Sequence, residues 1–416
     1  MHYSHTRYLL SAMVSMIIGS GCNQSTTEPE PILSLQEISS PADSVSGEPN
    51  LVVGDDGKIY LSWIERAGEK RHALQYATHE GDKWTEPRTV VEGERWFVNW
   101  ADFPSMAVAA DGVLAAHWLV RSNNHPYAYN VNLAQSLDGG ESWRTPILPH
   151  RDGTHTEHGF VSMFPWEDDT FLITWLDGRN FANKDPADPD TVSHSMTLRV
   201  ATVDRAGHLH EETELDARVC DCCQTSAVRT SYGAIVAYRD RSDGDIRDIS
   251  IVRWQDGQWS VPQPIFHDGW EIKACPVNGP ALAVDGQTVA LAWFTAAHDQ
   301  SQIKVSFSND EGMHFGEPII VDDGDPMGRV DVIMLPEGAA LVSWMETAGK
   351  QAEFRVRRVR PDGSIDPSMK ITSMSQARKS GFPRMIRKEN EIFFAWTHSD
   401  STTAVRSMVA TLNIGD

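Results

Sequence analysis

Residues 280–293 read PALAVDGQTVALAW, and this phrase decides the fold because the chain repeats it. Each copy has a short apolar segment, a turn that mostly contains Gly or Asp, and a second apolar segment that ends in an aromatic residue. Apolar and small residues alternate within each segment, which predicts two β-strands joined as a hairpin. The other copies are PNLVVGDDGKIYLSW (49–63), PSMAVAADGVLAAHW (104–118), VSMFPWEDDTFLITW (161–175), TSAVRTSYGAIVAY (225–238), VDVIMLPEGAALVSW (330–344) and PRMIRKENEIFFAW (383–396).

The number of copies indicates the architecture of an all-β protein. Two more strand-like runs follow each copy, as IKVSFSN and FGEPIIV follow residues 280–293. Four antiparallel strands repeated seven times predict a seven-bladed β-propeller that spans residues 32–416 as one domain. The last repeat lacks a fourth run, so we expect the N-terminal segment ILSLQEIS (32–39) to complete that blade, and ring closure then removes exposed sheet edges.

Two segments, SLDGGESW (136–143) and SNDEGMHF (308–315), fit the SxDxGxx(W/F) pattern of the Asp-box. The chain therefore resembles the sialidase-like β-propeller superfamily with BNR repeats, over nearly its whole length after residue 40. The resemblance implies that these turns lie opposite the functional face. That face then carries the loops that lead into each first strand, here called leading loops, and the loops that follow each second strand. Because sialidases have six blades, a six-bladed sialidase-type propeller is the alternative.

The first 31 residues have the pattern of a bacterial export signal. Arg7 precedes an apolar run from Tyr8 to Ile18, too short for a bilayer-spanning helix of about 20 residues. Small residues before Cys22 resemble a lipoprotein signal, so residues 1–21 are predicted to be the signal peptide, Cys22 the lipidated residue and residues 22–31 a flexible tether. We expect a lipid-anchored protein of the cell envelope, in the periplasm or at the outer membrane. Ordinary cleavage to a soluble periplasmic product is the alternative.

The charge of the chain limits its partners. It has 36 basic and 58 acidic residues, a net charge of −22. This sign argues against nucleic acid or anionic lipid as a partner, so we expect the lipid anchor to be the only membrane contact. The acidity is spread along the chain, as it is in many soluble proteins, and we expect a monomer.

The leading loops carry polar residues that should meet at the central channel. Leading loops of a propeller crowd around its axis, so residues about 50 positions apart become neighbours. The predicted polar funnel contains Glu48 and Gln224, the catalytic candidates Asp102, His158 and Arg329, and the substrate-binding candidates Asn278, Asp331 and Arg384. Hydrogen bonding within the loops is the alternative role for these side chains.

The loops after the second strands supply further carboxylates and guanidinium groups. The catalytic candidates here are Asp177 and Asp240, and the substrate-binding candidates are Arg179, Arg239 and Arg241. Such groups suit acid–base chemistry or the clamping of an anionic sugar, and a surface ion-pair network is the alternative. Trp270, in a leading loop, is a candidate for stacking on a sugar ring or else packs beneath its loop.

Four cysteines fall in two adjacent leading loops. Cys220, Cys222 and Cys223 lie in VCDCCQTS (219–226), and Cys275 lies in KACPVNGP (273–280). An even set of four in an exported protein favours disulfides. A soft metal such as copper or zinc, completed by His158 or His155, and free reactive thiols are the alternatives.

The longest insertion, DGRNFANKDPADPDTVSHS (177–195), follows the second strand of the third repeat. Its closely spaced acidic residues admit a calcium site. A lid over the functional face and a merely solvated loop are the alternatives.

Two functions remain open at this stage. The resemblance to sialidases implies an exo-α-sialidase-like glycosidase in which Arg179, Arg241 and Arg329 hold a carboxylate and Asp102 is the acid. The sequence shows no tyrosine and glutamate pair like the one that sialidases use, and seven blades are closer to some polysaccharide lyases. We therefore expect a propeller that acts on, or binds, an anionic glycan. The alternative is a non-catalytic propeller whose cysteines hold a metal or a disulfide and which binds a partner protein.

Overall fold

The computed structural model describes residues 1–2, 31–167, 169–183 and 195–413. Contacts group Ile32–Asp416 into one compact unit, separate from Met1–Pro31. The predicted signal peptide, the lipidation site Cys22 and nearly all of the tether lie outside the described residues, so they stay predictions. None of the helices in the described ranges is long and apolar enough to cross a membrane.

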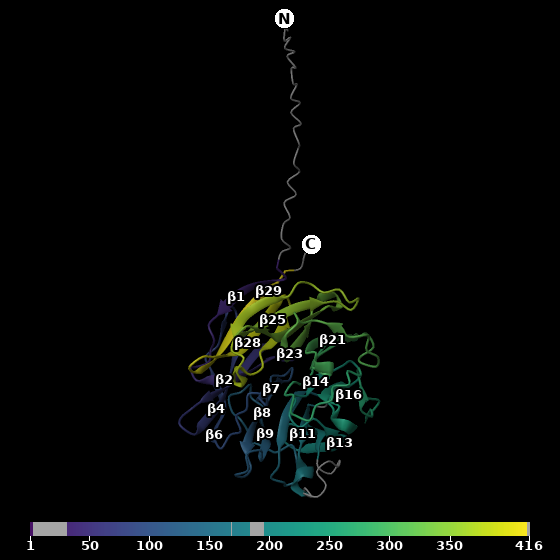
Figure 1. The fold of residues 1–416 in the computed structure, drawn as a ribbon. Coiled ribbons are helices and arrows are strands. Elements are labelled where there is room, and N and C mark those ends of the chain that lie inside the picture. Colours follow the sequence, from purple (N-terminus) through teal and green to yellow (C-terminus); the bar gives the residue numbers. More distant parts are fainter. Residues whose placement is uncertain (3–30, 168, 184–194, 414–416) are drawn as a thin grey trace. The chain divides into compact units, whose positions relative to one another are not determined.

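Seven antiparallel sheets follow one another along the chain and form a ring, which confirms the predicted seven-bladed propeller (Figure 1). The first strands of successive blades contact one another around the whole ring, and the first strand of the last blade contacts that of the first. The strands of blades 1 to 3 are β2 (Ser46–Val53), β3 (Ile59–Arg66), β4 (Arg71–Glu80), β5 (Lys83–Trp84), β6 (Arg88–Glu94), β7 (Ser105–Val108), β8 (Leu114–Arg121), β9 (Tyr129–Ser136), β10 (His158–Pro165), β11 (Phe171–Asp177), β12 (Met196–Val203) and β13 (Leu209–Val219).

The remaining four blades repeat this order of strands. Their strands are β14 (Ser226–Arg229), β15 (Ala234–Arg239), β16 (Ile249–Gln255), β17 (Gln258–Trp259), β18 (Gln263–Pro264), β19 (Ala281–Asp285), β20 (Thr288–Thr295), β21 (Gln302–Ser308), β22 (Ile319–Ile320), β23 (Pro326–Met334), β24 (Ala340–Ala348), β25 (Gln351–Val359), β26 (Met369–Met374), β27 (Arg384–Lys388), β28 (Glu391–Ser399) and β29 (Thr403–Leu412). Short 3₁₀ turns occur at Arg179–Asn183, Asp243–Asp245, Ala297–Asp299, Pro336–Gly338 and Arg378–Ser380.

The N-terminal strand closes the ring as predicted. β1 (Leu33–Ile38) is the outer strand of the seventh blade and pairs antiparallel with β29, from Leu33 opposite Leu412 to Ile38 opposite Ser407. The first and last strands of the propeller therefore share one sheet, and unfolding from either end of the propeller must break this pairing.

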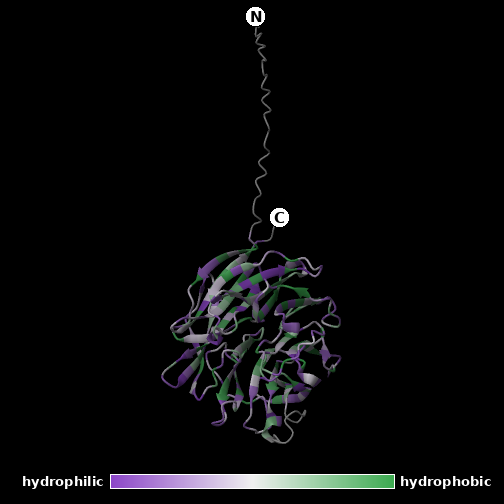
Figure 2. Ribbon diagram, in the orientation of Figure 1, coloured by the Kyte–Doolittle hydropathy of each residue, from purple (hydrophilic) through white to green (hydrophobic). Residues whose placement is uncertain are grey.

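The hydrophobic core lies between neighbouring blades. Apolar strand residues of two successive blades share one cluster, as Ile235 of β15 does with Leu291 and Trp293 of β20. Figure 2 shows the hydrophobic stretches on the strands. The aromatic residues that end five of the repeated phrases, Trp63, Trp175, Trp293, Trp344 and Tyr238, are fully buried and form part of the framework between blades.

Buried tryptophans need a partner for the indole N–H group, and the carboxylate two positions later often supplies it. Nε1 of Trp175 donates to Asp177 over 2.8 Å, and Nε1 of Trp344 donates to Glu346 over 2.6 Å. This explains why acidic residues recur after the second strands. It gives Asp177 a structural partner.

Both Asp-boxes form the same hydrogen-bonded turn. In the first, the Ser136 hydroxyl donates to Asp138 over 2.8 Å and the Ser142 N–H group donates to the same carboxylate over 2.9 Å. In the second, the Ser308 hydroxyl and the His314 N–H group donate to Asp310 in the same way. The turns follow the third strands of their blades, β9 and β21, and the antiparallel strand order places them at the end of each blade opposite the leading loops.

The outer edges of the blades vary. Within the described residues blade 2 has three strands, and its outer edge is a single bridge between Leu133 and Ile147. Prolines at positions 146 and 149 flank that bridge, and proline has no N–H group with which to extend a ladder. The inner strands, which carry the site residues, keep their regular order.

Candidate functional site

The seven blades enclose a cavity of about 200 Å³ at the centre of the ring, here called the hub cavity. It is lined by the first strands and leading loops of all seven blades, which confirms that residues far apart in sequence converge there. Lining residues, one from each blade, are Asn50, Asp102, Phe160, Gln224, Pro280, Asp331 and Arg384.

Two buried carboxylates in the hub join one blade to the next. Oδ1 of Asp102 accepts the backbone N–H of Phe160 over 2.7 Å. Oδ2 of Asp331 accepts the backbone N–H of Met385 over 3.0 Å. Gly159 makes room for the first contact, because a Cβ at that position would lie 2.0 Å from Oδ2 of Asp102.

Two side-chain amides also join neighbouring blades by accepting backbone N–H groups. Oε1 of Gln224 accepts the N–H of Gly279 over 3.0 Å, and Oδ1 of Asn278 accepts the N–H of Arg329 over 2.7 Å. Asp331, Asn278 and Gln224 thus have the hydrogen-bonding role that was the alternative for the funnel residues.

Asp102 has a second set of partners that Asp331 lacks. The Tyr129 hydroxyl lies 3.1 Å from Oδ2 of Asp102 and 2.8 Å from Oε1 of Glu157. Asp102 is 3% exposed, Tyr129 is fully buried against Phe97, and Glu157 is half-buried. This arrangement, here called the acid cluster, therefore meets solvent through Glu157.

Both carboxyl groups of the acid cluster hold their protons more strongly than usual. Burial raises the pKa of Asp102 to about 7, although the hydrogen bonds from Phe160 and Tyr129 lower it. Burial also raises the pKa of Glu157 to about 8, with a lowering effect from Tyr129 and a further increase from the charge of Asp102. The cluster can donate a proton near neutral pH, which general acid catalysis requires.

The other side of the hub is cationic and aromatic. The Arg384 guanidinium lies 3.5 Å from Oδ2 of Asp331 and 5.8 Å from the Phe103 ring centre, and its Nε has no hydrogen-bond partner among the described residues. Nearby, Trp100 is half-buried, and the exposed Arg378 lies 6.0 Å from its ring. These groups offer positive charge and an aromatic face beside the cavity.

The arginines predicted to clamp a carboxylate are engaged by different partners. Arg329 is buried, donates to the carbonyl of Gly381 over 2.9 Å and lies 5.0 Å from the Trp100 ring, and burial lowers its pKa to about 10. Arg241 donates to Asp245 over 2.8 Å. Arg179 belongs to blade 3, as described below.

Arg239 and Trp270 form a buried cation–π pair that links several loops. Arg239 is 2% exposed and donates to the carbonyls of Asn278, Arg247 and Phe294. Its guanidinium lies 4.8 Å from the Trp270 ring, which is itself 6% exposed. As placed, the Trp270 ring packs beneath its loop, the alternative that the sequence left open.

His158 and Asp177 lie in a buried polar network in blade 3. Nε2 of His158 is 3.1 Å from Oδ2 of Asp152 and 3.7 Å from Oδ1 of Asp177. Arg179 pairs with Asp177 and with Glu212, each over 2.7 Å. His158 and Asp177 are fully buried, so the network ties the loop after β11 to the leading loop of the same blade.

Asp240 lies apart from the acid cluster, beside the framework tyrosine of blade 4. It accepts a hydrogen bond from the Ser250 hydroxyl over 3.1 Å. Burial, with the charge of Asp216 nearby, raises the pKa of Asp240 to about 6. Asp216 itself accepts the Tyr238 hydroxyl over 2.6 Å.

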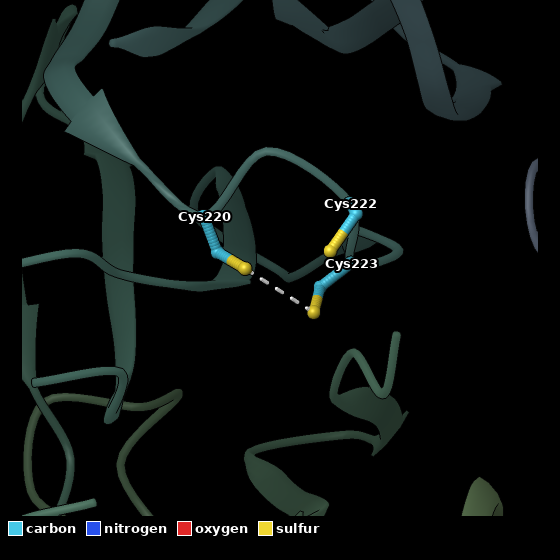
Figure 3. A group of neighbouring side chains, drawn as sticks. All are labelled: Cys220, Cys222 and Cys223. Carbon is cyan, nitrogen blue, oxygen red and sulfur yellow. Dashed lines mark hydrogen bonds between the residues drawn. The ribbon is translucent and has the colours of Figure 1, made fainter. Parts of the chain in front are cut away.

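The cysteines converge as predicted, and all four are free thiols in the described structure. Figure 3 shows Cys220, Cys222 and Cys223 with their sulfurs facing one another. Burial alone would raise the pKa of Cys220, but hydrogen bonds with Cys222 and Cys223 and the charge of Arg247 hold it well below its usual range. A hydrogen bond with Cys222 lowers the pKa of Cys275.

Most of the loop predicted as a calcium site lies outside the described residues. Residues 184–194 hold its acidic run, DPADPD, and belong to that gap. The calcium site therefore stays a prediction.

The sequence did not reveal Tyr129 and Glu157 as a pair. Tyr129 opens a third strand, and Glu157 directly precedes His158, which is one of the predicted funnel residues. A weak signal was therefore present one position away. The contact itself depends on a parallel bridge between Tyr129 and Glu157, which joins blade 2 to blade 3.

No family model and no curated protein matches the chain. Among solved structures, a Dyadobacter fermentans protein of unknown function has a TM-score of 0.51 at 13% identity, and the match covers 92% of this chain and 100% of that one. Polysaccharide lyase Uly1 has a TM-score of 0.52 at 8% identity, covering 89% and 90%. The NanB sialidase from Streptococcus pneumoniae has a TM-score of 0.48 at 10% identity, covering 91% and 94%. The first two matches show a similar fold at low identity, and the activity of this chain must be argued from its own site.

Proposed function

We propose that this chain is an exported, envelope-anchored propeller that acts on an anionic glycan at the mouth of its central channel, as a glycoside hydrolase or lyase. One observation carries the proposal: the Tyr129 hydroxyl lies within hydrogen-bond distance of two carboxyl groups, Asp102 and Glu157. The leader pattern before Cys22 supports the exported location.

Proton counting explains why this contact favours acid–base chemistry. A tyrosine hydroxyl has one proton and can donate to one carboxylate at a time. The second contact is satisfied when the other carboxyl group is protonated and donates to the tyrosine oxygen. The raised pKa values of Asp102 and Glu157 agree with such a shared proton. Glu157 is the partly exposed member, so it is the catalytic acid, and Asp102 and Tyr129 are positioning residues.

The cationic side of the hub supplies the complementary charge for the substrate. Arg384 lines the hub cavity with a partly exposed guanidinium whose Nε lies 3.5 Å from Asp331, and Arg378 is exposed beside the half-buried Trp100. A guanidinium binds a carboxylate through paired hydrogen bonds, and an indole face packs against a sugar ring. Together these residues favour a substrate that carries a carboxylate, such as a sialic or uronic acid.

The test compares Glu157→Gln with the matched control Glu141→Gln, both in the full-length chain. Glu141 is an exposed glutamate of the first Asp-box, opposite the leading loops. Hydrolysis or elimination is measured on α-sialosides and on uronic-acid oligomers. We expect Glu157→Gln to lower kcat/KM roughly 100- to 10,000-fold, the usual contribution of a general acid, and Glu141→Gln to leave it unchanged.

The pH profile gives a second readout. A general acid works while it is protonated, so wild-type activity should fall as the pH rises through about 8, where Glu157 loses its proton. The proposal fails if the wild-type protein neither cleaves nor binds any of these substrates, or if Glu157→Gln keeps wild-type activity and an unchanged pH profile.

A further inference from the structure

The four thiols form a second cluster, and the proposed acid–base chemistry gives them no role. The sulfurs of Cys220, Cys222 and Cys223 all lie within 4.8 Å of one another, and those of Cys220 and Cys223 are 3.5 Å apart. Cys220 directly follows β13, and the other two belong to the turn that leads into β14 (Figure 3). A tight turn of four residues therefore presents three sulfurs to one point.

A fourth sulfur comes from the next blade. Cys275 lies in the leading loop of blade 5, near enough to Cys222 for each thiol to shift the pKa of the other, although its sulfur is not one of the three that all lie within 4.8 Å of one another. It is exposed and Cys222 is half-buried, whereas Cys220 and Cys223 are buried. The cluster, here called the thiol cluster, thus has a buried floor and an opening toward solvent.

Arg247 supports the buried side of the thiol cluster. Its Nη1 donates to Sγ of Cys220 over 3.1 Å, and the Arg247 side chain is itself buried. A guanidinium offers only donors, so this contact favours a sulfur with free lone pairs and negative charge. A thiolate held in this way is the form of cysteine that binds metals.

The spacing of the sulfurs fits one metal ion. Sulfurs that share a zinc ion at about 2.3 Å lie about 3.8 Å apart in a tetrahedron. The sulfurs of Cys220 and Cys223 are 3.5 Å apart and all three sulfurs of the turn lie within 4.8 Å of one another, so small side-chain rotations bring them into this range. An all-sulfur set selects zinc or cuprous copper over calcium or magnesium, which prefer oxygen ligands.

A second group, formed by His150, Asp152 and His158, also has its ligand atoms close together. Its carboxylate already accepts from His158, and Arg179 lies 3.7 Å from the same oxygen. That oxygen is therefore already engaged by two partners. Beside the thiol cluster, Arg247 contacts Cys220, and the half-buried Asp221 next to Cys222 supplies a negative charge that Arg241 partly offsets from 3.8 Å.

We propose that Cys220, Cys222, Cys223 and Cys275 bind one thiophilic ion, Zn²⁺ or Cu⁺, which links the leading loops of blades 4 and 5 at the channel mouth. On binding, each thiol that still carries a proton releases it to solvent, and metal–sulfur bonds replace the weak contacts between thiols. Arg247 keeps Cys220 oriented toward it. The proposal does not depend on the glycan activity.

The test uses the full-length chain, reduced and kept without oxygen, with Zn²⁺ in one arm and Cu⁺ in the other. Each metal is added in excess, free metal is removed by gel filtration, and the retained metal is measured by elemental analysis. X-ray absorption then identifies the ligand atoms. We expect one ion per chain with sulfur ligands only, and the arm that retains more metal identifies the ion that the site prefers.

Matched variants separate the thiol cluster from a chance thiol. Cys275→Ser and Cys222→Ser alter the partly exposed members and should weaken binding at least tenfold. Cys22→Ser removes the remaining cysteine, outside the cluster, and should leave the stoichiometry unchanged. Should Cys220→Ser fail to fold, the two partly exposed variants still carry the test.

Three results would overturn the metal site. These are a reduced wild-type protein that retains neither ion, a Cys22→Ser protein that loses as much metal as Cys275→Ser, and a retained ion whose ligands are nitrogen or oxygen. Glu157→Gln should keep full metal loading, so failure of the proposed activity and failure of the metal site can be told apart.

Discussion

Asp102 and Asp331 both line the hub cavity, Asp102 from the leading loop of blade 2 and Asp331 from the first strand of blade 6, and they differ in the groups around them. Each is a buried hub carboxylate that accepts a backbone N–H group of the following blade. Asp331 has the guanidinium of Arg384 at 3.5 Å, whereas Asp102 has the hydroxyl of Tyr129 at 3.1 Å. The two carboxylates therefore join neighbouring blades in the same way, and the side chains around each decide what else it can do.

The consequence is a difference in charge between the two sides of the hub. Burial raises the pKa of Asp331, but the charge of Arg384 opposes the rise. No cation opposes it at Asp102, where the next group along is another carboxyl, Glu157. One side of the hub thus carries a charge pair and the other stores a proton.

The largest expected effect comes from removing each of the two carboxylates. Asp331→Ala leaves the Met385 N–H group unpaired and takes away the partner of Arg384. Because Arg384 is partly exposed, we expect a loss of about 3 kcal/mol in the free energy of unfolding. Asp102→Ala should cost about 2 kcal/mol, since Glu157 still accepts from Tyr129. Urea unfolding at pH 6 measures both, and a larger loss for Asp102→Ala would contradict the comparison.

The next effect concerns pH. The folded protein keeps protons on Asp102 and Glu157 up to about pH 7 and 8, whereas carboxyl groups of the unfolded chain lose them near pH 4. The folded state therefore binds more protons in this window, and the free energy of unfolding should fall as the pH rises from 5 to 8.

Variants isolate this contribution from that of other titrating groups. Asp102→Asn does not titrate, so its unfolding free energy should fall less between pH 5 and pH 8 than that of the wild type. Asp331→Asn should change the slope less, because Arg384 already favours the charged form. The measurement is urea unfolding at the two pH values. An equal change of unfolding free energy with pH for wild type and Asp102→Asn would show that Asp102 does not hold a proton in this range.

The smallest effect on stability is expected on the cationic side. The Arg384 side chain is 26% exposed and its pair with Asp331 is long, so Arg384→Gln should cost less than about 1 kcal/mol in the free energy of unfolding. Under the proposed function it should still weaken the binding of an acidic oligosaccharide several-fold. Arg387→Gln, on the same strand and not a lining residue of the hub cavity, is the control. Equal affinities for the two variants, measured by calorimetry, would place the anion elsewhere.

Much of the fold could be predicted because its signals are local. The repeated phrase from PNLVVGDDGKIYLSW onward placed the first two strands of every blade, and residues 32–39 were recognised as the closing strand. Convergence of Cys222 with Cys275 followed from the ring alone. Each of these depends on periodicity and chain order, which a single sequence displays.

The candidate site was harder to predict because its contacts cross between blades. Asp177 and Arg239 are both charged residues at the end of a second strand, and the sequence does not distinguish their roles. In the structure Asp177 accepts the indole N–H of Trp175, whereas Arg239 is buried and donates to backbone carbonyls. Tyr129 and Glu157 were missed because neither stands in the repeated phrase. Backbone atoms of a neighbouring blade decide which polar side chains are held in hydrogen bonds and which remain available to a ligand.

The sequence by itself determined seven blades, most of them four-stranded, their closure by the N-terminal strand, and the face on which the leading loops gather. These follow from alternation of apolar residues and from turn chemistry, which act over a few residues. Only the tertiary structure decided that Asp102 shares a tyrosine with Glu157 while Asp331 faces an arginine. Burial and neighbouring charge set the protonation of a carboxyl group, and both are properties of the packed ring.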